Sequence, residues 1–270
     1  MLSQADYNSE YFATLSQAAL SSARIVVPAL LSIIQPQSVI DVGCGIGAWL
    51  SVFREHGIET ILGLDGEYVD RSQLLVPRSC FRVADLAEPV TLHERFDLAV
   101  SLEVAEHLPP SSANGFVESL CRLAPVVLFS AAFPGQGGTC HLNEQWPDYW
   151  RRLFNEKGFL MFDPLRPVLW HDKRVAFYYR QNMYLFVCAD LVQSSPRLIQ
   201  LPEVKDGNEL LLVAGYIVEG NTGLRVTLRR LPRLLRDSIV RCFKKILEKR
   251  KPSDSGRQNI DHKSVQEKMR

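Results

Sequence analysis

The segment Val39-Ile-Asp-Val-Gly-Cys-Gly-Ile-Gly-Ala-Trp-Leu50 points to one class of fold. Residues 38–41 read as the start of a buried strand, three alternating glycines follow, and an apolar helical pattern comes next. A strand, a glycine-rich turn and a helix form the first loop of a nucleotide-binding sheet. Glycine lets the backbone come close to a ligand and adopt a positive φ. The segment therefore predicts an α/β fold with a ligand at this loop.

An acidic residue, Asp41, stands two positions before the first glycine. In a dinucleotide site the pyrophosphate lies at the N-terminus of the following helix, where free N–H groups and the helix dipole favour negative charge. A carboxylate that points into this loop would repel the phosphates. S-adenosylmethionine has no phosphate and carries a sulfonium and an ammonium group. Asp41 therefore favours this ligand over a dinucleotide.

Three further segments read as strands that end in a polar residue. They are Thr60-Ile-Leu-Gly-Leu-Asp65, Cys80-Phe-Arg-Val-Ala-Asp85 and Phe96-Asp-Leu-Ala-Val-Ser101. Asp65 follows Gly47 by 18 positions, close to the offset of about 20 residues at which a carboxylate meets a ribose. Open α/β sheets bind ligands at the carboxyl ends of their strands. These side chains are therefore predicted to line one crevice.

With these motifs, the chain resembles the class I S-adenosylmethionine-dependent methyltransferases over about residues 1–190. VIDVGCGIG is similar to the first motif of the family and ILGLD to its second acidic strand. RVADL is similar to the third loop, and FDLAVSLEVAEHL to the fourth strand with the helix that follows. The resemblance implies a doubly wound, Rossmann-like sheet of seven strands, mostly parallel, with the last strand antiparallel. It also implies S-adenosylmethionine as the cofactor.

The resemblance also assigns roles to residues at the ends of the first four strands. Asp41 and the glycines would lie at the methionine end of the cofactor, and Asp65 would bind the ribose hydroxyls. Asp85 would accept the adenine amino group beside the backbone of Leu86. Ser101 and Glu103 would close the site near the methyl group. The implied cofactor-binding residues are thus Asp41, Gly43, Gly45, Gly47, Asp65, Asp85, Leu86, Ser101 and Glu103.

The segment after the fifth predicted strand, residues 133–146, is rich in side chains that can act in catalysis or substrate binding. Its PGQGG…HxNEQWPxYW run is similar to one in a subgroup of bacterial methyltransferases. A hydroxyl acceptor needs a base with a pKa near 7, and histidine is the first choice. We predict His141 as this base or as a substrate contact, with a loop-stabilising hydrogen bond as its alternative role. His107 is the second candidate base, with support of the cofactor loop as its alternative.

A metal site is a further interpretation of the same residues. Glu103 and Glu106 are three positions apart and would combine with His107 or His141. Their spacing does not match a strong metal-ligand motif. The sequence therefore predicts no metal.

Periodicity and turn residues predict the remaining elements. Further strands are expected at residues 125–130, 159–168 and 182–189. Helices are expected at residues 8–22, 23–34, 46–56, 70–75, 89–94 and 111–123, within 142–156, and within 172–180.

Charge divides the chain into an acidic body and a basic tail. Residues 1–220 have a net charge of −9 and residues 221–270 a net charge of +10. We expect a methyltransferase domain at 1–195, a connector with one extra apolar element at 196–223, a basic amphipathic helix at 224–251 and a disordered tail at 252–270. The basic helix favours peripheral contact with an anionic membrane, with docking on the acidic body or an acidic partner as alternatives. Nucleic acid is disfavoured because no aromatic stacking surface accompanies the charge.

The sequence shows no run of 18 apolar residues and no signal peptide, so we expect a cytoplasmic protein that is membrane-peripheral if its tail binds lipid. The predicted function is S-adenosylmethionine-dependent methyl transfer to a small-molecule or glycan acceptor, at oxygen in preference to nitrogen. Two alternatives stay open: a non-catalytic S-adenosylmethionine-binding module that works through its basic tail, and an NAD-dependent oxidoreductase. The oligomeric state is not predicted.

Overall fold

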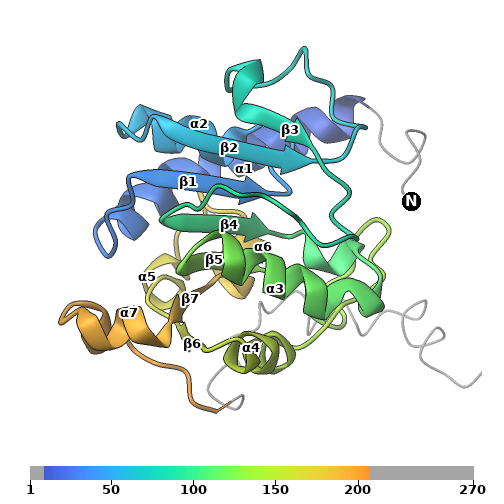
Figure 1. Ribbon diagram of the computed structural model, residues 1–270. Helices are drawn as coiled ribbons and strands as arrows, with labels where there is room; N and C mark the ends of the chain where they lie inside the picture. Colours follow the sequence, from blue (N-terminus) through green and yellow to red (C-terminus); the bar gives the residue numbers. More distant parts are fainter. Residues whose placement is uncertain (1–8, 207–270) are drawn as a thin grey trace, which may run out of the picture. The chain divides into compact units, whose positions relative to one another are not determined.

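A computed structural model describes residues 9–206 of the chain (Figure 1). The predicted apolar element within the connector, the basic helix at 224–251 and the tail at 252–270 lie outside the described residues. No helix within the described part combines the length and the hydropathy that a bilayer crossing requires.

The centre of the fold is a seven-stranded sheet with the strand order β3-β2-β1-β4-β5-β7-β6. β7 runs antiparallel to both of its neighbours, and the other pairs are parallel. This confirms the predicted doubly wound, mostly parallel sheet with an antiparallel last strand. The strands are β1 (Ser38–Val42), β2 (Thr60–Asp65), β3 (Phe81–Val83), β4 (Leu98–Leu102), β5 (Val126–Ser130), β6 (Phe159–Phe162) and β7 (Tyr184–Cys188).

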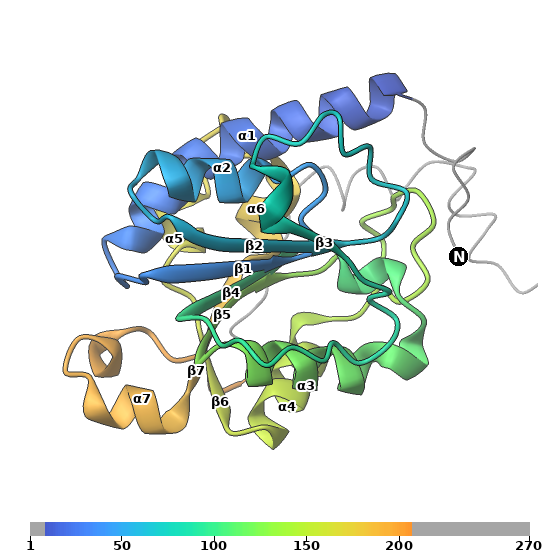
Figure 2. The same cartoon turned by 45° about the horizontal axis from the view of Figure 1, so that its top comes forward.

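Helices cover both faces of the sheet. Figure 2 shows α1, α2 and α6 on one face and α3 and α4 on the other. The helices are α1 (Ser9–Leu31), α2 (Ala48–Glu55), α3 (Ala113–Leu123), α4 (Pro147–Glu156), α5 (Arg166–Leu169), α6 (Phe177–Asn182) and α7 (Ala189–Ser194). Short 3₁₀ turns include η3 (Ala105–His107) and η4 (Pro110–Ser112).

The central strands are apolar along their whole length because both of their faces are covered. In β1, Val39 packs into the core layer that also contains Val26 of α1 and Leu50 of α2. The next residue, Ile40, packs into the opposite layer with Phe116 of α3. The polar side chains of these strands come at or near their carboxyl ends. Since β2, β1, β4 and β5 are parallel, these ends meet at one edge of the sheet.

The predicted strand at 159–168 is wrong in its second half. β6 ends at Phe162, and α5 begins at Arg166. The Asp163 carboxylate accepts a hydrogen bond from the Arg166 N–H at 3.3 Å, and a proline occupies the first turn of α5. Both features start a helix rather than continue a strand.

Two short predicted helices, at 70–75 and 89–94, are absent from the described structure. Asp70 accepts a hydrogen bond from the Ser72 N–H at 2.9 Å, which is a turn of the Asx type. Val90 donates its N–H to the Ser119 hydroxyl of α3 at 3.1 Å, so this segment is tied to a neighbouring helix. Side-chain acceptors have replaced the helical hydrogen bonds in both places.

Two other helix predictions need adjustment. The stretches at 8–22 and 23–34 form one helix, α1, that continues through Pro28. The fully buried side chains of Val26, Val27 and Leu30 hold this part of α1 in the core, which offsets the hydrogen bond that proline cannot make. The helix expected within 172–180 is shifted toward the C-terminus, to Phe177–Asn182.

Candidate active site

The structure places five polar residues, four of them predicted, at the carboxyl edge of the sheet. Asp41 of β1 and Asp65 of β2 are 2% and 3% exposed, and Ser101 of β4 is fully buried. Ser130 ends β5 and is fully buried as well. Glu103 follows β4 directly, and its backbone N–H donates to the Ser130 hydroxyl at 3.1 Å.

The glycine loop between β1 and α2 needs glycine for two different reasons. Gly43 has a φ of +91°, and a Cβ there would lie 2.3 Å from the Val104 side chain. Gly45 has a φ of +53°, and a Cβ there would meet nothing within 4 Å. The first glycine therefore allows close packing against the segment after β4. The second presents its backbone to open space at the edge of the sheet.

Asp65 is the side chain that fixes this loop. Its carboxylate accepts the Gly45 N–H at 2.6 Å and the Gly66 N–H at 2.7 Å. It also accepts a hydrogen bond from the hydroxyl of Tyr68, a side chain that is half exposed. Burial raises the pKa of Asp65, while these three hydrogen bonds lower it. Asp65 thus joins β2 to the glycine loop from which it is separated by 20 residues.

Asp41 lies beside this network and forms no ion pair within residues 9–206. One of its oxygens, Oδ2, is buried and has no hydrogen-bond partner among the described residues. Burial raises the pKa of Asp41 well above its ordinary value, and the nearby Asp65 carboxylate raises it further. A buried acid of this kind is costly unless a cationic group approaches it. The site therefore fits the sulfonium and ammonium groups of S-adenosylmethionine and does not fit a pyrophosphate.

Asp85 and Leu86 have a different environment from the other predicted cofactor residues. Asp85 is exposed after β3 and accepts the Ala87 N–H at 3.0 Å, while the Leu86 side chain is buried in the core. The assignment of Asp85 and the Leu86 backbone to the adenine stays a prediction.

Glu103 is held in place by amide side chains from two distant segments. Its carboxylate accepts hydrogen bonds from Gln136 Nε2 at 2.9 Å and from Asn182 Nδ2 at 3.0 Å. Gln136 Oε1 in turn accepts from Asn182 at 2.8 Å and from Gln181 at 3.2 Å. Burial raises the pKa of Glu103, and the hydrogen bonds from Asn182 and Gln136 lower it. The sequence did not predict this network. Its one indication in the sequence is the polar pair Gln181 and Asn182, which ends α6 just before the apolar strand β7.

Glu103 also has an unusual backbone. Its φ is +57°, and Cys140, with a φ of +58°, is the other non-glycine residue with positive φ within residues 9–206. Such strain is typical of functional sites. It also means that Glu103 does not share a helix face with Glu106, which lies in the 3₁₀ turn η3.

The two predicted catalytic histidines lie next to each other. The ring centroids of His107 and His141 are 4.9 Å apart, with the rings edge to face. Burial and the neighbouring His141 lower the pKa of His107 to about 4. His141 Nδ1 is 2.9 Å from a carboxylate oxygen of Glu144. Glu106, which is 1% exposed, completes this group, and burial raises its pKa well above the ordinary value, as does the Glu103 carboxylate.

Glu144 also organises the loop that carries His141. Its carboxylate accepts the Gly135 N–H at 3.0 Å and the Gly137 N–H at 3.2 Å, in addition to the His141 contact. We expect Glu144→Ala to increase amide hydrogen exchange at residues 135–141 by about tenfold, because hydrogen bonds to charged groups contribute about 1.5–3 kcal/mol each. Mass-spectrometric hydrogen exchange measures this. The control is Glu118→Ala, which removes an ion pair between Glu118, on α3, and Lys157. Equal exchange in both variants would contradict the role of Glu144.

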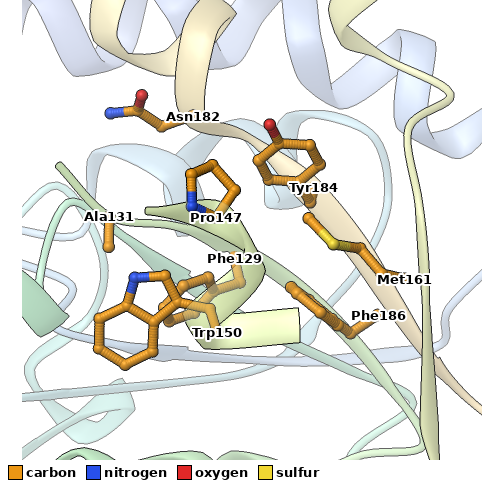
Figure 3. A pocket seen from close by; sticks show the side chains of 8 residues that line it. All are labelled: Phe129, Ala131, Pro147, Trp150, Met161, Asn182, Tyr184 and Phe186. Carbon is orange, nitrogen blue, oxygen red and sulfur yellow. The ribbon is translucent and has the colours of Figure 1, made fainter. Parts of the chain in front are cut away.

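One aromatic residue near this loop, Trp150, packs in the core of the domain. Trp150 is 2% exposed and packs on Phe129 with a centroid distance of 5.2 Å, so it belongs to the core. Figure 3 shows the cavity beside it, with the Tyr184 hydroxyl pointing toward Asn182. Its volume is about 10 Å³, roughly the space that one water molecule needs. This cavity is therefore too small to hold an organic acceptor.

Comparison with known proteins supports this interpretation of the fold. Residues 12–166 match the family model described as "Methyltransferase domain". No curated protein matches the chain. Among solved structures, DesVI from Streptomyces venezuelae has a TM-score of 0.51 and 15% identity, over 70% of this chain and all of that one. CalS10 from Micromonospora echinaspora, described as an amino pentose methyltransferase, has a TM-score of 0.49 and 14% identity, over 67% of this chain and 97% of that one.

Proposed function

The chain belongs to the methyltransferase domain family and is an S-adenosylmethionine-dependent methyltransferase, and from this premise we propose that it methylates an oxygen atom of a small-molecule or glycan acceptor. The observation that carries the proposal is the pair of histidines next to Glu103 and Glu106, at the carboxyl ends of β4 and β5. Family membership leaves the nicotinamide alternative without support. Beyond family membership, we propose the class of the acceptor and the atom that receives the methyl group.

The cofactor residues that we propose are those at the edge of the sheet. Asp41 provides a buried carboxyl group for the methionine end, and Gly45 leaves its backbone accessible. Asp65 is the proposed partner of the ribose hydroxyls, and Ser101 and Glu103 close the site near β4. When bound, S-adenosylmethionine supplies an electrophilic methyl carbon and leaves as a neutral thioether.

The residues of the chain have to position the acceptor and remove its proton. Positioning alone contributes up to about 7–11 kcal/mol to such reactions. We assign the activation of the acceptor hydroxyl to His141, which Glu144 orients through Nδ1 at 2.9 Å. His107 is less suited to accept a proton, because its lowered pKa makes it a weak base.

A hydroxylated small molecule or glycan matches the surroundings of these histidines. Gln136 is partly exposed beside Glu103 and carries an amide group that suits hydroxyl-rich ligands, while the buried amides of Gln181 and Asn182 hold Gln136 in place. Residues 1–220 have a net charge of −9, which disfavours a polyanionic acceptor such as nucleic acid. The bacterial subgroup with the PGQGG loop remains part of this proposal.

The test is methyl transfer from isotopically labelled S-adenosylmethionine to a panel of sugars, hydroxylated metabolites, amines and nucleic acids. We expect labelled products from hydroxylated acceptors, with fragmentation in the mass spectrometer that places the methyl group on oxygen. Transfer to amines alone, or to nucleic acid alone, would contradict the proposal. Transfer to nucleic acid alone would also contradict the argument that the net negative charge of residues 1–220 disfavours a polyanionic acceptor.

A further inference from the structure

Three metal-ligating side chains converge beside the proposed acceptor site. Glu106 and His107 come from η3, directly after β4, and His141 comes from the loop after β5. One ligand atom of each residue lies within 4.8 Å of the ligand atoms of the other two. Two ligands at about 2.1 Å from one ion lie at most about 4.2 Å apart. A small closing movement of the side chains would therefore bring all three to one ion.

Two of these side chains present buried ligand atoms without partners. Neither carboxylate oxygen of Glu106 makes a well-formed hydrogen bond with the described residues, although the Ala132 backbone lies near enough to lower its pKa. The Nδ1 atom of His107 is also buried and without a partner among the described residues. Unsatisfied buried polar atoms of this kind cost free energy and call for a ligand. The remaining member of the cluster, His141, has a second ring nitrogen, Nε2, that makes no hydrogen bond with residues 9–206.

In each of the two histidines, one ring nitrogen contacts the protein and the other is left for a ligand, as in known metal sites. His141 gives Nδ1 to Glu144, which leaves Nε2 for a ligand. His107 makes a hydrogen bond with the backbone of Cys140, while its Nδ1 stays unpartnered among the described residues. A metal-binding histidine almost always has its second nitrogen held by a carboxylate or a backbone carbonyl. The second contacts of both residues therefore follow this pattern.

The backbone joins the two segments that carry the cluster. The Glu106 carbonyl accepts the N–H groups of Leu142 and Asn143 at 2.8 and 2.9 Å. Gly138 lies so close to the His141 ring that a Cβ would be 2.1 Å from Nε2. The three side chains are thus held by a rigid local frame rather than brought together by chance on a surface.

We propose that Glu106, His107 and His141 bind one divalent cation of the first transition row, such as Zn²⁺, Co²⁺ or Mn²⁺. A set of two imidazoles and one carboxylate suits transition ions, of which Mn²⁺ is the one that most favours oxygen, whereas Mg²⁺ and Ca²⁺ prefer oxygen ligands throughout. The spacing of these residues in the sequence did not predict the site, because the third ligand comes 34 positions after His107. The proposal rests on the proposed function in one respect, the hydroxyl acceptor. A cation at this site would make that hydroxyl more acidic, and His141 would then act as a metal ligand.

The test is isothermal titration of the chelator-treated full-length chain with Zn²⁺, Co²⁺, Mn²⁺ and Mg²⁺. We expect saturable binding of a transition ion, with Mg²⁺ weaker, and an increase of the thermal midpoint with that ion. Glu106→Gln has nearly the same shape as the wild-type side chain and should weaken the binding at least about tenfold. His141→Asn is the second variant, and His93→Gln, at an exposed histidine outside the cluster, is the control.

The readouts separate this proposal from the proposed function. Calorimetry needs no acceptor, and S-adenosylmethionine binding should be unchanged in Glu106→Gln. Absence of saturable binding, or equal affinity in wild type, Glu106→Gln and His141→Asn, would overturn the cation site. Methyl transfer to a hydroxyl that continues in the presence of a chelator would also overturn it, and would leave the proposed function intact.

Discussion

Substitution of Asp65 by alanine is expected to weaken S-adenosylmethionine binding at least about 100-fold. The carboxylate anchors the glycine loop through Gly45 and is the proposed acceptor for the ribose hydroxyls. Hydrogen bonds to a charged group contribute about 1.5–3 kcal/mol each, so the loss of two of them accounts for this change. Calorimetric titration of the two proteins with the cofactor measures it.

Substitution of Tyr68 is a control for which we expect the opposite change in cofactor affinity. Its hydroxyl donates to the same carboxylate in the absence of ligand, and its side chain is half exposed. It therefore competes with a ribose hydroxyl for Asp65. Tyr68→Phe should strengthen cofactor binding about two- to tenfold, the effect of one hydrogen bond. Weaker binding in Tyr68→Phe, or unchanged binding in Asp65→Ala, would contradict the role of Asp65.

Substitution of Arg166 by methionine is expected to cost about 3–5 kcal/mol of unfolding free energy, as is typical when one partner of a buried ion pair is removed. Arg166 is 1% exposed and contacts Asp163 Oδ2 through Nε and Nη2, at 3.0 and 2.8 Å. Its Nη1 donates to the Gln181 carbonyl at 2.8 Å, and its guanidinium lies 4.3 Å above the Tyr184 ring. Without Arg166, Asp163 and this carbonyl lose their partner. Urea unfolding measures the effect.

Arg174 offers a matched control for Arg166. It pairs with Asp172 close in sequence but on the surface, where solvent screens the interaction. Arg174→Met should therefore change the unfolding free energy little. If Arg166→Met does not fold, the double variant Asp163→Leu with Arg166→Met should recover part of the stability, because it leaves no unpaired buried charge. Equal stability in Arg166→Met and Arg174→Met would contradict the structural role assigned to Arg166.

The cofactor half of the site could be predicted from the sequence because it depends on local patterns. The spacing of glycines and strand-end acids follows from one strand–turn–helix unit and its parallel neighbours. The seven-stranded sheet is confirmed as predicted, with Asp41 in β1 and Asp65 at the end of β2, while the cofactor contacts of these two residues stay a prediction. The predicted strand at 159–168 and the short helices at 70–75 and 89–94 were wrong because single side-chain acceptors, such as Asp163 and Asp70, redirect the backbone.

The acceptor half could not be predicted in the same way. Glu103 meets Gln136 and Asn182 across 33 and 79 positions of sequence. His107 and His141 become neighbours only because β4 and β5 are adjacent in the sheet. Contacts of this kind depend on tertiary packing and on strained backbone at Glu103 and Cys140, which no periodicity in the sequence reports. The role of these histidines stays a prediction, and the side chains around them could be identified only from the fold.

The proposed cofactor site depends on one electrostatic feature: Asp41 is a buried acid, and we propose that it is the partner of a cationic ligand. Its pKa is raised in the folded chain, so the carboxylate lowers stability at any pH above the ordinary aspartate value of about 3.9. Asp41→Asn should therefore raise the unfolding free energy of the ligand-free protein at pH 7, and the gain should vanish as the pH falls below that value.

The decisive measurement is the affinity of wild type and Asp41→Asn for S-adenosylmethionine, by calorimetry, together with the unfolding of both proteins without ligand. We predict a more stable variant that binds the cofactor about tenfold more weakly, the effect of one charge-assisted interaction. An Asp41→Asn protein that binds the cofactor as tightly as wild type would contradict this role of the buried carboxylate.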